Sequence, residues 1–360
     1  MAINLHDKWA KKADRAFTTG SLLRSRLKAP HDFSGVKTVR LSNVITKAPV
    51  DYNRGNIIPG ASAYGSITEA EDWVQEMSVT QDKAWALKID KGNAREQDEE
   101  KSAALLFAAQ LGEQDIPLAE KYGFGRLLQL AGKVLGSGTA VTADNILERI
   151  DDGLAYQRAR SVPEGDKTIF LDSARMTMFN HARRAQGSDS LVNKAWSRGK
   201  VSEYNGCDVV LVPDDRWPTF VNFMIVSAKS ACMPYKLNEA ATFEGGGLFS
   251  GIGLKSRYIF DCFVVGIKAD GVYVDVETGS GKMTKVATPT IAAATGYVTC
   301  STAGATIKAT VDGTDPRYSN SAVTVSSGAA PAGAASGAKI RAYAYKTDCA
   351  PSDVGEGTMT

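Results

Sequence analysis

Histidine and cysteine, the residues that most often bind metals, are scarce and poorly spaced in this chain. Only His6, His31 and His181 occur, and no two of them have the i, i+4 spacing that brings two imidazoles to one metal ion on a helix. The five cysteines are an odd number without a paired short spacing, which argues against a zinc site and a disulfide framework and suits a reducing cytosol. These residues predict no metal site.

Two glycine-rich segments imitate nucleotide-binding loops but lack the required residues. Residues 279–282 read Gly-Ser-Gly-Lys, yet Val276 stands where a phosphate loop has its first glycine and Met283 where it has its magnesium-binding hydroxyl. In residues 245–251, Ser250 replaces the last glycine of the dinucleotide fingerprint. We interpret residues 279–282 as a hairpin turn.

The sequence also shows no recognisable residues for acid–base or nucleophilic catalysis. Asp151 and Asp152 are a carboxylate pair, but adjacent residues on a helix point in different directions. No Gly-x-Ser-x-Gly motif, which would present a nucleophilic serine, occurs. We therefore predict no catalytic residue, no cofactor-binding residue and no cofactor, and expect that the chain is not an enzyme.

Charge is balanced over the whole chain but not at its start. The formal net charge is +2, which gives no overall attraction to nucleic acid. Residues 1–30 hold seven Lys or Arg against two Asp, a net charge of +5. This arm, with a helix expected over residues 5–17, is either a solvated amphipathic segment or a contact for nucleic acid. Its candidate inward-facing residues are Lys8, Lys11, Lys12 and Arg15. No run of 18 apolar residues predicts a membrane span.

A long alternating segment follows a shorter strand expected near residues 39–42. From residue 73 to residue 91, Trp85, Leu87 and Ile89 share one face, and the alternation extends back through Met77. One strand of about 19 residues would span roughly 60 Å. A strand of that length cannot bury itself in a compact domain, so it would project and pack on a neighbouring subunit. The alternative is two ordinary strands separated near residues 80–82. The candidate intersubunit residues are Trp73, Trp85, Leu87 and Ile89.

A long helix and a mixed α/β region come next. Asn93 and Glu96 form a capping box, which predicts a helix that runs to about Tyr122 with a bend at Pro117. Between residues 123 and 285 we expect a helix and several apolar strands. The helix is expected at residues 142–160 and strands at 168–171 and 209–212, with two more strands within 257–274, and residues 220–231 are apolar throughout.

The composition changes near Val286. Of the 74 residues from 287 to 360, 44 are Ala, Gly, Ser or Thr, and none is Leu, Phe or Trp. Short alternating segments separated by glycine-rich turns predict a small β-sandwich, with disorder as the alternative for residues 327–338. In residues 339–345 the inner face is expected to hold Ile340, Ala342 and Ala344. The outer face would form a mixed cationic and aromatic stripe for a surface contact, or an ordinary solvated face: Lys339, Arg341, Tyr343 and Tyr345.

The order of these features resembles the major capsid protein of tailed phages, of the Hong Kong phage type. The resemblance rests on residues 33–39, 87–93, 205–213 and 221–223, with the strands of residues 257–274 after them. It implies an α+β fold with an N-terminal arm (1–32), an extended β-loop (33–92), a spine helix and the start of a peripheral domain (93–135), and apical and peripheral domains (136–286). Residues 287–360 would add a C-terminal all-β sandwich. That segment is similar to the Ig-like module at the C-terminus of chitobiase-type hexosaminidases.

This resemblance implies a structural subunit of an icosahedral viral shell, which assembles into hexamers and pentamers around packaged DNA. Its expected partners are further copies of itself, a separate scaffolding protein, a portal, a decoration protein and packaged DNA, but no membrane. The expected location is the virion capsid, assembled in the host cytoplasm. A chain stopped near residue 286 would still assemble if the sandwich only decorates the surface. The alternative function is a carbohydrate-active enzyme or glycan-binding protein with an accessory sandwich.

Overall fold

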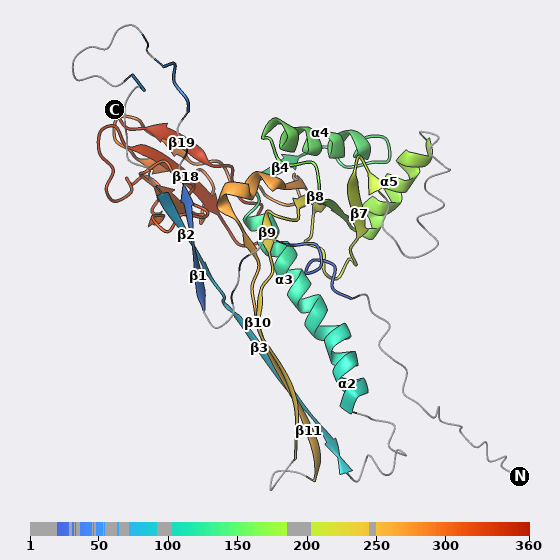
Figure 1. Cartoon of the computed structure of the whole chain (residues 1–360). Helices are drawn as coiled ribbons and strands as arrows, with labels where there is room; N and C mark the ends of the chain where they lie inside the picture. The colour runs from blue at the N-terminus through green and yellow to red at the C-terminus, as the bar shows by residue number, and fades with distance from the viewer. Residues whose placement is uncertain are drawn as a thin grey trace, which may run out of the picture. The chain divides into compact units, whose positions relative to one another are not determined.

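The chain forms two compact units in a computed structural model (Figure 1). The first unit comprises Met1–Lys37 and Val79–Thr284, and the second comprises Thr38–Ser78 and Lys285–Thr360. The structure describes residues 20–28, 31, 33, 37–44, 46, 48–52, 54, 63–64, 72–91, 103–185, 203–244 and 250–360. The helix expected at residues 5–17, the basic residues Lys8, Lys11, Lys12 and Arg15, and the capping box at Asn93 lie outside this part.

A six-stranded mixed sheet is the centre of the first unit. Its strand order is β4-β13-β8-β5-β7-β6. Strands β5 and β8 are buried along their whole length, which explains the apolar runs at residues 169–171 and 223–226. The bounds are β4 (Lys133–Ser137), β5 (Lys167–Leu171), β6 (Glu203–Tyr204), β7 (Cys207–Leu211), β8 (Val221–Ser227) and β13 (Val272–Glu277).

Helices cover both faces of this sheet. Helices α4 (Ile146–Ala159) and α5 (Ser173–Ala185) share one hydrophobic cluster with Ile169 and Leu171 of β5. The neighbouring Phe170 points the other way, and its ring centroid lies 5.4 Å from that of Phe124. The expected helix at residues 142–160 and the strands at 168–171 and 209–212 are confirmed within a few residues, and the apolar segment 220–231 contains β8.

The long helix is interrupted by a π-helical turn. It comprises α2 (Ala103–Gln110), the π-helix η1 (Leu111–Asp115) and α3 (Ile116–Gln129), so it continues beyond the expected end at Tyr122. Pro117, which cannot donate a backbone hydrogen bond, directly follows the π turn at the start of α3. The irregularity expected at this proline is therefore present, as a wider turn on its N-terminal side.

Three long strands form a ribbon that Figure 1 shows running away from the central sheet of the same unit. Strand β11 (Gly251–Phe260) lies between β10 (Tyr235–Glu244) and β3 (Gln81–Asp90), antiparallel to both. The expectation of a single strand from residue 73 to residue 91 is wrong. The alternation is divided between β2 (Asp72–Ser78) and β3, which belong to different sheets. At the break, Thr80 bonds to Asp261 instead of to a neighbouring strand. A small pair, β9 (Ala231–Cys232) with β12 (Phe263–Val264), and the 3-10 helix η2 (Gly266–Gly271) complete this unit.

The second unit joins two distant parts of the sequence. Strand β1 (Thr38–Val44) pairs with β2, and residues 285–360 form a four-stranded antiparallel sheet of order β17-β16-β18-β19 beside a two-stranded pair, β14-β15. Ile340, Ala342 and Ala344 belong to its small-residue core, as the alternation predicts. The bounds are β14 (Thr290–Ile291), β15 (Val298–Thr299), β16 (Thr306–Thr310), β17 (Val323–Val325), β18 (Lys339–Tyr345) and β19 (Gly355–Thr358).

Glycines let the two sheets of residues 285–360 approach closely. A Cβ atom at Gly355 would lie 2.0 Å from the carbonyl oxygen of Pro289, and one at Gly357 would lie 3.0 Å from Ile291. No side chain fits at Gly355 without moving backbone. Residue 355 of β19 must therefore be glycine, because the segment that leads into β14 lies directly against it.

Candidate assembly surfaces

One face of the ribbon is attached to the long helix of the same chain. The indole N–H of Trp85 donates to Asp115 at 2.9 Å, and the hydroxyl of Tyr258 donates to the other carboxylate oxygen at 3.3 Å. The Trp85 ring also packs on Phe107, with 5.3 Å between centroids. Trp85 was expected to have no partner within its own subunit, and that premise is wrong because the π turn presents Asp115 to it.

The far end of the ribbon carries its exposed apolar side chains. Leu87 is 40% exposed and Ile252 is 48% exposed, and both lie on the Trp85 face two residues apart in register. Phe243 lies on the opposite face, where its ring covers Gly253. Ile89 is half-buried on the same face as Leu87. The last candidate, Trp73, is half-buried in β2 of the other unit.

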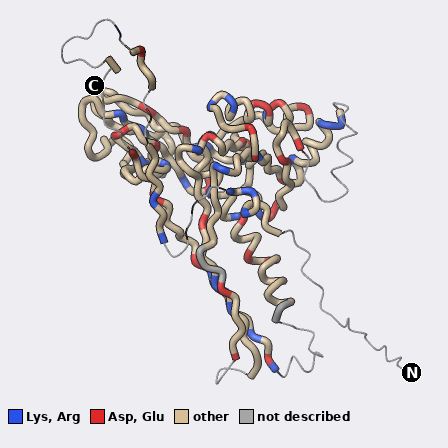
Figure 2. The backbone as a smooth tube through the Cα atoms, viewed as in Figure 1, with Lys and Arg blue, Asp and Glu red and all other residues tan. Residues whose placement is uncertain are grey.

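Basic and acidic residues occur along the ribbon (Figure 2), and the face opposite to Trp85 includes Asp82, Lys255 and Arg257. The Arg257 guanidinium and the Asp82 carboxylate are 2.6 Å apart, and the bond holds the pKa of Asp82 below its usual value. Next to this pair lies a depression of about 530 Å³ with a floor of small side chains and a charged rim. Its lining residues are Ala84, Trp85, Ala86, Glu239, Lys255, Ser256 and Arg257. Exposed apolar ends and balanced charges suit a surface that packs on another protein.

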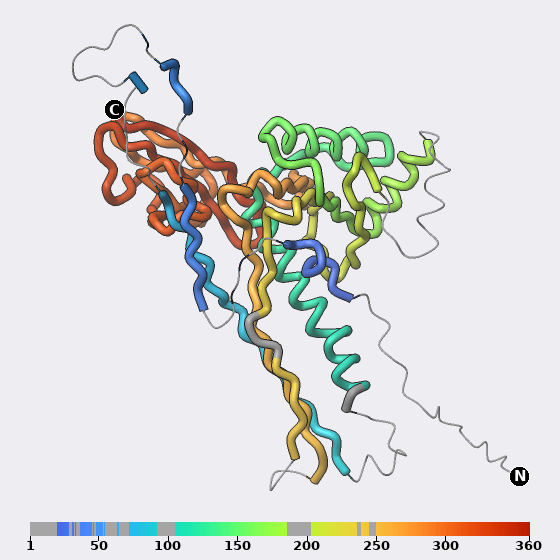
Figure 3. Tube along the Cα trace, in the orientation of Figure 1, coloured from blue at the N-terminus to red at the C-terminus, as the bar shows by residue number. Residues whose placement is uncertain are grey.

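The described part of the N-terminal arm is anchored in the first unit, next to α3 (Figure 3). Buried Glu120 accepts hydrogen bonds from the backbone N–H groups of Leu22 and Leu23, and its other carboxylate oxygen pairs with buried Arg216 at 2.7 Å. A Cβ atom at Gly123 would lie 2.8 Å from the Leu23 side chain, so the contact is tight.

Two basic residues of the arm are bound within the chain. Arg26 pairs with Asp208 at 2.8 Å, and the guanidinium of Arg24 lies 4.6 Å from the centre of the Tyr235 ring. Both contacts hold residues 20–28 against the first unit.

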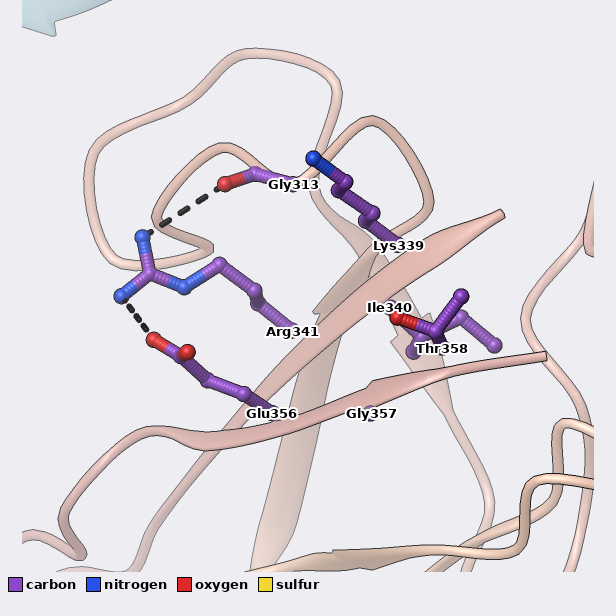
Figure 4. A pocket seen from close by; sticks show the side chains of 7 residues that line it. All are labelled: Gly313, Lys339, Ile340, Arg341, Glu356, Gly357 and Thr358. Carbon is purple, nitrogen blue, oxygen red and sulfur yellow. Dashed lines mark hydrogen bonds and ion pairs between the residues drawn. The ribbon is translucent and has the colours of Figure 1, made fainter. Parts of the chain in front are cut away.

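The outer face of β18 and β19 holds a shallow pocket of about 440 Å³ (Figure 4). In it, Arg341 is bound by Glu356 at 2.6 Å and donates to the Gly313 carbonyl at 3.5 Å. The Lys339 side chain lines the same pocket beside the turn at Gly313, whose φ of +76° suits glycine.

Tyr343 was expected to be exposed with Lys339, Arg341 and Tyr345 on one face of β18, and this expectation is wrong. This side chain is 4% exposed, because the loop that precedes β17 folds over it and Arg317 lies 5.8 Å from its ring centre. Tyr345 is exposed, and its ring packs on that of Tyr343 with 6.0 Å between centroids. Buried Tyr343 therefore lies between the pocket and exposed Tyr345 along β18, so these residues do not form one continuous exposed stripe.

Two further groups that could do chemistry, Asp275 and Cys232, are built into the interior of the first unit. Buried Asp275 accepts hydrogen bonds from Arg149 and Asn222. The thiol of Cys232 is buried, which raises its pKa to about 12. Residues 279–282 form a turn, with the N–H of Lys282 bonded to the Gly279 carbonyl, but the bridge between Thr278 and Met283 is parallel, so the turn is not the expected hairpin. Among the residues that the structure describes, no three His, Cys, Asp or Glu side chains gather as metal ligands, and no helix is long and apolar enough to cross a membrane.

Comparison with known proteins identifies the fold. No protein-family model matches the chain, and no curated protein does. A solved structure from Mycobacterium phage Che8 matches with a TM-score of 0.58 and 14% identity over 76% of this chain and 98% of the solved chain. The capsid structure of cyanophage P-SCSP1u matches with a TM-score of 0.58 and 10% identity over 76% and 93%. The mature capsid of bacteriophage PhiM1 matches with a TM-score of 0.55 and 13% identity over 77% and 93%.

The chain therefore has a mixed α+β fold that it shares with phage capsid structures. This confirms the expected class and the capsid resemblance over most of the chain. The Hong Kong phage type, the domain boundaries and the Ig-like character of residues 287–360 stay predictions. Sequence reasoning missed the anchoring carboxylates Asp115, Glu120 and Asp261, whose partners are distant in the sequence.

Proposed function

We propose that this chain is the structural subunit of a bacteriophage shell, and that copies of it assemble into hexamers and pentamers that enclose packaged DNA. The observation that carries the proposal is the fold, which matches more than nine-tenths of the length of solved phage capsid chains. In this role the chain performs no catalytic step. Its location is the virion capsid, assembled in the host cytoplasm.

The surfaces of the first unit support this role. The ribbon extends exposed Leu87 and Ile252 to its far end, and apolar side chains of this size stabilise a contact by about 1.5–3 kcal/mol each when they become buried. Ile89 and, in the second unit, Trp73 are half-buried and would complete their burial against neighbouring subunits. Head-to-tail contacts of this kind close into rings around a symmetry axis.

The basic arm and the remaining partners belong to the same proposal. Lys8, Lys11, Lys12 and Arg15 would face the interior and contact DNA without sequence preference, since phosphate contacts need only positive charge. A separate scaffolding protein and a portal would direct assembly, and a decoration protein would bind outside. Lys339, Arg341 and Tyr345 would lie on the outer surface.

The test is assembly of the purified full-length chain. We expect electron microscopy and sedimentation to show hexamers, pentamers or closed particles, alone or with a scaffolding protein from the same phage genome. A chain that stays monomeric under all these conditions contradicts the proposal. A matched control is the double variant Leu87→Asp, Ile252→Asp, which we expect to stay folded and monomeric.

A further inference from the structure

The β1–β2 pair lacks what a stable sheet needs by itself. Two antiparallel strands alone are marginally stable in water, and a third strand or a packing surface is required. One face of the pair is buried and includes two polar side chains, Asn43 and Gln75. A buried polar face requires a specific partner, because unpaired amide groups are costly to bury.

Residues of the C-terminal segment supply the third strand. The backbone N–H of Asn320 donates to the carbonyl of Val74 at 3.1 Å, and Ser319 forms an antiparallel bridge with Gln75. These contacts occupy the edge of β2 that β1 leaves open. Residues 319–320 thus act as a short third strand, although Gln75 and Ser319 are 244 positions apart in the sequence.

The loop that presents residues 319–320 is held in one conformation. Asp312 accepts hydrogen bonds from Thr314 and Ser321, and Asp315 accepts bonds from Arg317. The backbone N–H of Ser319 bonds to the Asp315 carbonyl at 3.0 Å. A loop fixed in this way loses little further entropy when it docks on a strand.

We infer that residues 312–321 are a docking loop that holds the β1–β2 pair in place within the same chain, so that Thr38–Ser78 and Lys285–Thr360 fold as one cooperative unit. The C-terminal segment is then a brace for β1 and β2 and not an appended surface domain. A chain that stops near residue 286 loses the ordered β1–β2 pair. This inference does not depend on the proposed function.

The first test changes one backbone N–H in the full-length chain. Asn320→Pro removes the donor to Val74, whereas the control Asn320→Ala keeps it. We expect hydrogen exchange of residues 38–44 and 72–78 to become about tenfold faster in the proline variant and to stay unchanged in the alanine variant. Exchange in β16 and β18 reports whether the C-terminal sheet stays folded. Unchanged exchange of β1 and β2 in the proline variant overturns the inference.

The second test does not depend on how the proline variant folds. Gln75→Cys with Ser319→Cys places two thiols at a bridge position, where oxidation should form a disulfide within one chain and slow exchange in β1 and β2. Glu76→Cys with Ser319→Cys is the control, since Glu76 points to the exposed face. The inference is overturned by equal cross-linking in both variants, by a disulfide that joins two different chains, or by exchange that oxidation leaves unchanged.

Discussion

The buried carboxylate of Asp261 accepts two hydrogen bonds from Thr80, one from its backbone N–H and one from its hydroxyl, each at 2.9 Å. A third bond comes from the hydroxyl of Tyr122 in α3 at 2.8 Å. One carboxylate therefore joins the point where β2 ends and β3 begins to the long helix and to the end of β11. The direction of the ribbon within the first unit depends on this junction.

Removing one bond at this junction should destabilise the first unit. We expect Thr80→Val to lower the free energy of unfolding by about 1.5–3 kcal/mol, because a bond to a charged buried acceptor is lost. Thr80→Ser, which keeps the hydroxyl, should have a much smaller effect. Chemical denaturation monitored by circular dichroism measures both variants. Equal stability of the valine and serine variants would mean that the hydroxyl contributes nothing.

Exposed apolar residues at the end of the ribbon should be needed for assembly but not for folding. Leu87→Asp with Ile252→Asp should remove about 1.5–3 kcal/mol of contact energy per subunit, since less than half of each side chain is left to bury, and it also places two carboxylates in the contact, so particles should not form. Leu87→Met with Ile252→Val keeps the surface apolar and should assemble. Circular dichroism checks the fold and sedimentation the assembly. Normal particles from the aspartate variant would exclude this end of the ribbon as a contact.

Trp85→Asp should behave differently from Leu87→Asp. It would place a second carboxylate next to Asp115 and remove the indole donor, so we expect loss of folding stability as well as of assembly. The two single variants, compared by thermal denaturation, separate a folding role from an assembly role. A Trp85→Asp chain as stable as the Leu87→Asp chain would contradict the attachment of the ribbon to the helix.

Because the segment that leads into β14 lies close to β19, we expect that Gly355 cannot be replaced by a larger residue without loss of stability. Gly355→Ala should destabilise the second unit by about 1–3 kcal/mol, since its Cβ atom would meet the Pro289 carbonyl. The neighbouring Glu356→Ala removes only a partly exposed ion pair with Arg341 and should cost less than about 1 kcal/mol. Hydrogen exchange of β18 in each variant measures the difference. The reverse order of the two effects would contradict the packing.

Protonation of the Asp312 carboxyl should lower the stability of the second unit at acidic pH. Burial raises the pKa of this carboxyl, but hydrogen bonds from Thr314 and Ser321 outweigh that effect and hold it below the ordinary value of 3.8. A lowered pKa in the folded state means stability that is complete above about pH 4 and is lost as the pH falls further. Asp312→Asn should flatten this loss, whereas Asp348→Asn, in an exposed turn, should not. Exchange of β16 and β18 between pH 5 and pH 3 is the measurement.

Local patterns predicted the elements of this chain better than their partners. The period of two in residues 81–90 and 339–345 gave the right strands, because alternation depends only on neighbouring residues. The break between β2 and β3 was predicted only as the alternative to one long strand, because the bond that marks it joins Thr80 to a residue 181 positions away. The burial of Tyr343 was missed for the same reason, since Arg317 reaches it from a separate loop. Strand β19 has the sequence Gly-Glu-Gly-Thr, in which Thr358 is the one residue of the β-branched and aromatic kinds that indicate strands.

The main hydrophobic cluster of residues 285–360 has Ala, Val and Ile as its buried members, and the buried rings of Tyr318 and Tyr343 lie outside this cluster. Such a core exposes little apolar surface when it unfolds, so the heat-capacity change per residue of the second unit should be smaller than that of the first, where Phe and Leu fill the interior. A small heat-capacity change flattens the curve of stability against temperature. The second unit should therefore keep its modest stability over a wide range of temperatures, and cooling should weaken it less than it weakens the first unit.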